Sequence, residues 1–184
     1  MLSRKQAFVI LKKYLKDEDN IKISIATEAI LKEMARNLNF DEELWGITGL
    51  LHNLDYEYTL REPEKKGTLS AQLLDGLIPE QAVNAIKANN YMHTDYIPTT
   101  ALDKALIATA AISGLIIVTV KLTQSNKIDD VDLELLIDKF NDKTFAVRYN
   151  RNRIGLCTDA GIELKYFLEL SLNTLKSISK DLGI

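Results

Sequence analysis

The chain has 184 residues, of which 46% are hydrophobic and 27% are charged. This balance supports one sizeable core and excludes a chain that is disordered throughout. The 23 Lys and Arg against 26 Asp and Glu give a net charge of −3, so a chain-wide electrostatic grip on nucleic acid is not expected. With two histidines and one cysteine, any metal site would depend heavily on carboxylates.

The composition also bears on location. Cys157 has no partner for an internal disulfide, and lysines recur within residues 1–15, where a secretory leader would be apolar. We therefore expect a cytoplasmic protein. No histidine lies near Cys157 in the sequence, so a buried thiol is a better interpretation than a nucleophile.

Apolar residues recur at helical spacing along the first third of the chain. One stripe lies within residues 8–15, a second within 23–38 and a third within 44–54. Asp41 is a plausible N-cap of the third helix, because acidic residues follow it in the first turn, where the helix dipole favours them.

The helical pattern is lost in residues 56–67, where a dense run of charged residues predicts an exposed loop. Short helices are expected over residues 69–74 and 79–89. A second loop, containing His93 and Asp95, should follow them.

Residues 105–120 form the most apolar run of the chain. A membrane span needs roughly 20 apolar residues, and this run is shorter and flanked by charges, so a buried core helix is predicted and no membrane association. Asp130 is a plausible cap of the next helix, and the last stripe covers residues 164–175. The sequence therefore predicts an all-α fold, a single domain over residues 1–184 with about seven or eight helices.

The one compact cluster of chemically able side chains contains His52, Asp55 and Glu57, at the end of an apolar helix. His52 and Asp55 are three residues apart, which on a helix separates their Cβ atoms by about 5–6 Å. Both could therefore reach one ion or one water. A histidine that is simply hydrogen-bonded to a nearby carboxylate explains the same spacing.

This cluster belongs to the segment Gly49-Leu50-Leu51-His52-Asn53-Leu54-Asp55-Tyr56-Glu57. The segment resembles the G-L-L-H-D-x-D-Y-E signature of the HD-domain superfamily, which comprises metal-dependent phosphohydrolases with an all-helical core. Further stretches resemble family motifs in the same order, at residues 22–29, 66–71, 85–90 and 102–116. The resemblance is strongest over residues 20–155 and to small stand-alone bacterial members, and it implies a helical bundle of the HD type.

The resemblance places the metal ligands of the family at Ile23, His52, Asn53 and Ala110. Isoleucine and alanine have no lone pair, and the asparagine amide is neutral, so the set has no anionic ligand left. Without a metal ion there is no activated water to act as nucleophile. The resemblance therefore implies a degenerate site with no bound metal and without the hydrolase activity.

Two further family histidines correspond to Lys66 and Asn89. A lysine at this position could attract a phosphate without a metal, although a solvated loop lysine is an equally plausible interpretation. Lys66, Asn89, Glu57 and His93 are accordingly the candidate residues of a pocket for a small phosphorylated ligand.

Arg148, Arg151 and Arg153 form a small basic group after Phe145 and beside Tyr149. It could contact a phosphate or an acidic partner. A solvated face with structural arginine pairs is the ordinary alternative.

Three interpretations follow. The first is a degenerate HD-domain protein that has lost hydrolysis and binds a small phosphorylated ligand or has a regulatory role. The second is an active phosphohydrolase on a nucleotide or small phosphate ester, in which His52, Asp55 and a relocated ligand such as His93 or Asp95 hold manganese, iron or zinc. The third is a structural helical adaptor, which a stable homodimer would support.

Overall fold

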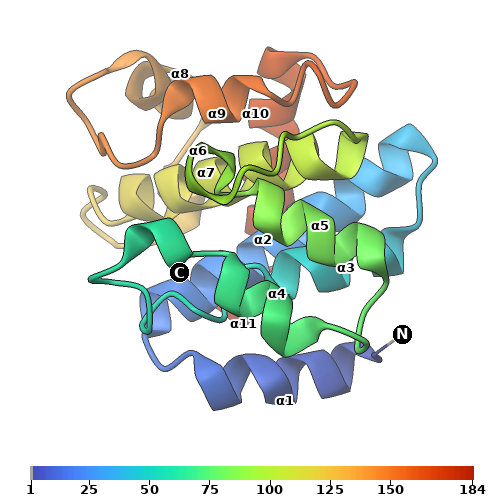
Figure 1. Ribbon diagram of the computed structural model, residues 1–184. Coiled ribbons are helices and arrows are strands. Elements are labelled where there is room, and N and C mark those ends of the chain that lie inside the picture. Colours follow the sequence, from blue (N-terminus) through green and yellow to red (C-terminus); the bar gives the residue numbers. More distant parts are fainter. Residues whose placement is uncertain (1) are drawn as a thin grey trace.

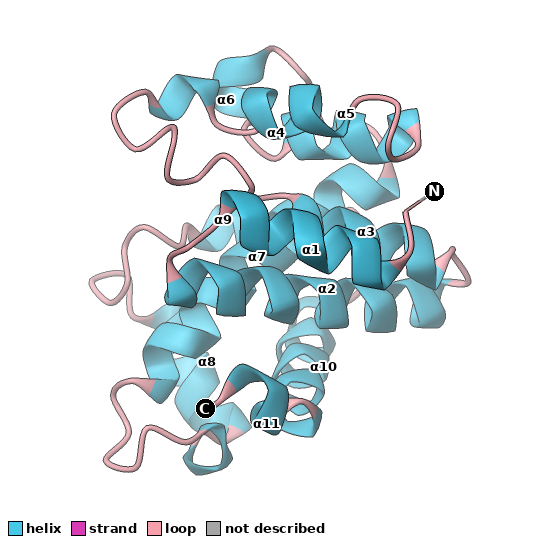
Figure 2. Ribbon diagram, turned by 90° about the horizontal axis from the view of Figure 1, so that it is seen from below, coloured by secondary structure: helices cyan, strands magenta, loops and turns pink. Residues whose placement is uncertain are grey.

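The computed structural model describes residues 2–184, and every regular element in this range is a helix (Figures 1 and 2). The α-helices are α1 Arg4–Tyr14, α2 Glu18–Leu38, α3 Glu42–Leu51, α4 Thr68–Leu74, α5 Glu80–Ala88, α6 Tyr91–Thr94, α7 Ala101–Val120, α8 Leu133–Asn141, α9 Arg151–Gly155, α10 Leu164–Ser177 and α11 Ser179–Leu182. Two short 3-10 helices are η1 Pro63–Lys65 and η2 Ile128–Asp130.

The all-α prediction is confirmed, but seven or eight helices is too low a number, because residues 2–184 form eleven α-helices. Three of the additional elements, α6, α9 and α11, have only four or five residues each. A helix of one turn contains too few positions to show a repeating apolar stripe, so the pattern that reveals longer helices cannot reveal these. His93 consequently lies in α6 and not in a loop.

One of the two predicted N-caps is confirmed and the other is wrong. Asp41 caps α3 as expected, and its side chain accepts a hydrogen bond from the backbone N–H of Leu44. Asp130 is not the cap of α8, because it ends η2 and its carboxylate is bonded to Ser125. Asp132, two residues later, is the cap. Both aspartates precede the same apolar stripe. Because η2 includes Asp130, only Asp132 is free to cap α8.

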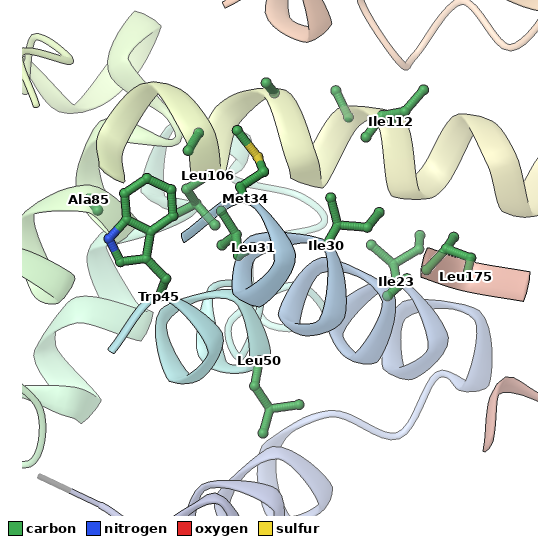
Figure 3. Close-up of a cluster of buried hydrophobic side chains, with 14 of the residues drawn as sticks. Ile23, Ile30, Leu31, Met34, Trp45, Leu50, Ala85, Leu106, Ile112 and Leu175 are labelled. Atoms are coloured by element: carbon green, nitrogen blue, oxygen red, sulfur yellow. The ribbon is translucent and has the colours of Figure 1, made fainter. Parts of the chain in front are cut away.

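Helices α2 and α7 form the centre of the core (Figure 1). Ile30, Leu31 and Met34 of α2 lie between α7 and α3, and Leu106 and Ile112 of α7 belong to the same buried cluster (Figure 3). Within the described residues, α7 alone is long and apolar enough to cross a membrane, and 78% of its most apolar window is buried inside the protein. The predicted buried core helix is therefore confirmed.

The backbones of α2 and α3 approach each other closely at Gly49. A Cβ atom at this position would lie 2.9 Å from the carbonyl oxygen of Thr27 and 2.9 Å from the Cδ1 atom of Leu31. The first of these neighbours is backbone and cannot move without displacing α2. The absence of a side chain at Gly49 therefore sets how near α3 and its C-terminal end lie to α2.

We predict that Gly49→Ala lowers the free energy of unfolding by about 1–3 kcal/mol, because the added methyl group forces the two helices apart. Gly155→Ala is the matched control. Apart from the neighbouring residues and the backbone of its own helix, no described atom lies within 4 Å of a Cβ built at Gly155. Alanine in a helix should leave stability unchanged or raise it slightly. Urea unfolding followed by circular dichroism measures both, and equal stabilities of the two variants would contradict the prediction.

Candidate functional site

A pocket of about 370 Å³ lies where α3 ends. It is bordered by the first half of α2, the middle of α7, the end of α5 and the segments that precede α4 and α9. The lining residues are Asn20, Ile23, His52, Asn53, Tyr56, Lys66, Asn89, Asn90, Ala110, Ala111, Arg148, Tyr149 and Arg153. The volume suits a small ligand.

The pocket brings together residues that are far apart in the sequence. Ile23, His52, Asn53 and Ala110, the positions that the resemblance assigns to metal ligands, all line it. Lys66 and Asn89 line it as well. Six positions selected from motif order in the sequence thus share one cavity.

His52 follows the last residue of α3 and is 2% exposed. Its Nδ1 atom lies 2.7 Å from the carbonyl oxygen of Gly49. Burial lowers the pKa of His52 to about 4, and the nearby cations Lys66 and Arg153 act in the same direction. The imidazole is therefore neutral at physiological pH.

Asn53, also 2% exposed, belongs to a short chain of hydrogen bonds. Its Nδ2 donates to Oδ1 of Asn20 at 3.0 Å, and Nδ2 of Asn20 donates to Oδ1 of Asp17 at 2.8 Å. Asp17 is the N-cap of α2, and hydrogen bonds from the backbone N–H and then from the side chain of Asn20 lower its pKa. The chain joins the end of α3 to the beginning of α2.

Asp55 has a structural role that its sequence position does not reveal. Its buried Oδ2 atom accepts the backbone N–H groups of Gly67 at 2.7 Å and Ser70 at 2.9 Å, at the start of α4. Gly67 has φ +83°, and a Cβ there would lie 2.8 Å from the carbonyl oxygen of Ile86. Asp55 thereby fixes the backbone next to Lys66, and it is not among the pocket-lining residues.

Three cationic side chains line the pocket, and one of them was among the sequence candidates. Burial lowers the pKa of Lys66, against the opposing effect of Asp55, and its Nζ lies 5.5 Å from the ring centre of Tyr56. Burial also lowers the pKa of Arg153, whose Nη2 donates to the carbonyl oxygen and to Oδ1 of Asn89, both at 2.7 Å. Desolvated cations of this kind favour an anionic partner.

Arg148 and Tyr149 reach the pocket from the segment before α9. The guanidinium of Arg148 lies 4.8 Å from the ring centre of Tyr149. The ring of Tyr149 fills the space that a side chain at Gly114 of α7 would need, since a Cβ there would be 1.9 Å from its Cε1. The basic group seen in the sequence is therefore partly a pocket wall.

Arg151, the third arginine of the basic group, is hydrogen-bonded to backbone and does not line the pocket. Its guanidinium donates to the backbone carbonyl oxygens of residues 139, 140, 142, 145, 146 and 149, at 2.7 to 3.1 Å. These hydrogen bonds hold the segment between α8 and α9 in a fixed conformation around the guanidinium. The expectation of a solvated arginine face is wrong for Arg151 and Arg153, because tertiary contacts that sequence spacing does not show have placed one against backbone and the other in a pocket.

Other candidates lie elsewhere. Glu57 accepts the backbone N–H groups of Lys16 and Asp17, both at 2.6 Å, and so holds the connection between α1 and α2. His93 is exposed on α6 and is outside the pocket lining. Cys157 is a buried free thiol as predicted, and burial raises its pKa to about 12.

In comparisons with protein-family models, curated proteins and solved structures, no match to this chain was found. Within residues 2–184, no group of three or more His, Cys, Asp or Glu side chains is placed to hold a metal ion. Sequence reasoning did not select Asn20, Tyr149, Arg148 or Arg153 as pocket residues. For the two arginines, the sequence showed only that they cluster beside Tyr149. It did not show where in the fold this group would lie.

We predict that buried His52 makes the protein sensitive to acid. Its pKa is about 4 when folded against 6.5 ordinarily, so the unfolded chain takes up the proton at the higher pH. The stability supported by neutral His52 is complete above about pH 6.5 and is lost as the pH falls through about 4, by roughly 3 kcal/mol in total.

The measurement is urea unfolding between pH 7 and pH 4 for the wild type and for His52→Gln. The variant should lose less stability on acidification by about 2–3 kcal/mol, because it has no group to protonate at this position. His93→Gln, at an exposed position, should follow the wild-type curve. Parallel curves for all three proteins would show that His52 does not carry the effect.

Proposed function

We propose that this protein is a degenerate HD-like domain that binds a small phosphorylated ligand in its pocket without a metal ion, in a ligand-binding or regulatory role. The observation that carries the proposal is the charge of the pocket. Its thirteen lining residues, within the described chain 2–184, include Lys66, Arg148 and Arg153 and no carboxylate.

The donor set of the pocket does not fit a divalent metal. Ile23 and Ala110 offer no lone pair, and His52 and Asn53 offer one neutral nitrogen and one neutral oxygen. Removing water from a divalent cation requires anionic or multiple imidazole ligands, and the three pocket cations add repulsion. These side chains support a proposal in which no step depends on a metal.

The same side chains fit a phosphate group well. Burial disfavours the charged forms of Lys66 and Arg153, and the charges of Arg153 and Arg148 further lower the pKa of Lys66. A bound dianion relieves both effects, and charge-assisted hydrogen bonds from lysine and arginine are among the strongest polar contacts in proteins. The pocket is thus electrostatically complementary to a phosphate ester.

Hydrolysis with a relocated metal draws less support from the geometry. Asp55 directs one carboxylate oxygen to the backbone at the start of α4, and His93 and Asp95 are exposed and outside the pocket lining. These residues therefore do not surround one point together with His52.

We predict that Lys66→Gln and Arg153→Gln each weaken binding of propyl phosphate by tenfold or more, because each removes a desolvated charge from the anion site. Lys65→Gln is the matched control: Lys65 is the adjacent lysine, exposed and paired with Glu62. Isothermal titration calorimetry measures all four proteins. An equal loss in Lys65→Gln would contradict the proposal, and so would undetectable binding of both propyl phosphate and glycerol 3-phosphate to the wild type at millimolar concentration.

A second prediction tests the placement of the HD-like positions. The combination of Ile23→His, Asn53→Asp and Ala110→Asp should create binding of one equivalent of manganese or cobalt, because it restores imidazole and carboxylate ligands around His52. The wild type should contain negligible manganese, iron or zinc by elemental analysis after purification. Near one equivalent in the wild type would overturn the proposed metal-free function, and Ile23→His alone serves as the control for the triple variant.

A further inference from the structure

We propose that the ligand of this pocket is a polyhydroxylated phosphate ester, such as a polyol or sugar phosphate. Two pocket residues, His52 and Asn53, offer hydrogen-bond acceptors of fixed polarity that a phosphate dianion, which has no donor, cannot satisfy. The inference rests on the proposed function and names the class of ester that the site selects.

The carboxylate of Asp17 decides which amide atom of Asn53 donates and which accepts, through Asn20, which is hydrogen-bonded to both. Ionised Asp17 can only accept, so Asn20 must direct its Nδ2 to Asp17 and its Oδ1 to Asn53. Asn53 must then donate through Nδ2, which leaves its Oδ1 as the free end. Within residues 2–184 this buried Oδ1 atom has no hydrogen-bond partner.

The polarity of His52 is imposed in the same way. The carbonyl of Gly49 can only accept, so Nδ1 of His52 carries the proton and Nε2 is an acceptor. No donor in the described part of the chain is hydrogen-bonded to Nε2. His52 and Asn53 line the same cavity, so both acceptors belong to residues that border a ligand bound there.

The ligand group that satisfies these acceptors must be a donor. Phosphate oxygens are acceptors and would face the cations Lys66, Arg148 and Arg153 instead. An ammonium group would be a donor, but the three cations repel it. A neutral hydroxyl is therefore the favoured partner, and on binding it replaces any water at these atoms. A ligand without such a donor leaves buried acceptors unpaired, which is the strongest way in which a polar site rejects an analogue.

The test compares glycerol 3-phosphate with propyl phosphate by isothermal titration calorimetry on the wild-type protein. The two esters share the phosphate group and the three-carbon chain and differ in two hydroxyl groups. Glycerol 3-phosphate should bind at least fivefold more tightly. If the two bind equally, the inference is wrong and the proposed phosphate site stands; if neither binds at millimolar concentration, the proposed function fails first and the inference with it.

Two variants assign the preference to its atoms. Asn53→Leu removes one acceptor and keeps a similar side-chain volume, so it should reduce the ratio of glycerol 3-phosphate affinity to propyl phosphate affinity to less than twofold. Lys66→Gln should weaken both esters by the same factor and preserve the preference. A preference that survives intact in a folded Asn53→Leu protein overturns the role of this residue, and the wild-type comparison decides the ligand class even where a variant does not fold.

Discussion

The close approach of α2 and α3 at Gly49 is the constraint on which the pocket depends. With no side chain between the helices, the end of α3 lies beside the first turns of α2, where Asn53 can bond Asn20. The same glycine supplies the carbonyl that receives Nδ1 of His52. The position of the two adjacent pocket residues and the tautomer of the histidine thus both depend on the backbone at residue 49.

Outside the cavity, two charged side chains support its walls without entering it. Asp55 fixes the backbone that precedes α4, and Arg151 fixes the segment that precedes α9. Each charged side chain is hydrogen-bonded to several backbone groups, and these bonds offset the free energy of removing the ion from water. Within residues 2–184, Oδ1 of Asp55 has no hydrogen-bond partner, so the support comes from its Oδ2 atom and from the guanidinium of Arg151. The pocket cations make fewer hydrogen bonds to the backbone than Arg151 does, which leaves them available to a ligand.

The sequence predicts the longer helices well because α2 and α10 keep an apolar period and α7 is a nearly continuous apolar run, whereas single-turn helices carry no period to detect. The cavity was predictable in part: motif order grouped Ile23, His52 and Ala110 correctly. It did not reveal Arg153 as a pocket residue or Asp55 as an anchor, because both roles arise from chain segments that meet only in three dimensions. Glu57 and His93 were selected for their chemistry, and folding directs them elsewhere.

The six carbonyl contacts of Arg151 also have an entropic meaning. A segment of about ten residues without regular structure would ordinarily sample many conformations, and a ligand that needed one of them would lose affinity in selecting it. Arg151 ties this segment together from Lys139 to Tyr149, so Arg148 and Tyr149 are already in position before anything enters the cavity. The conformational entropy is lost once, during folding, and not again each time a ligand binds.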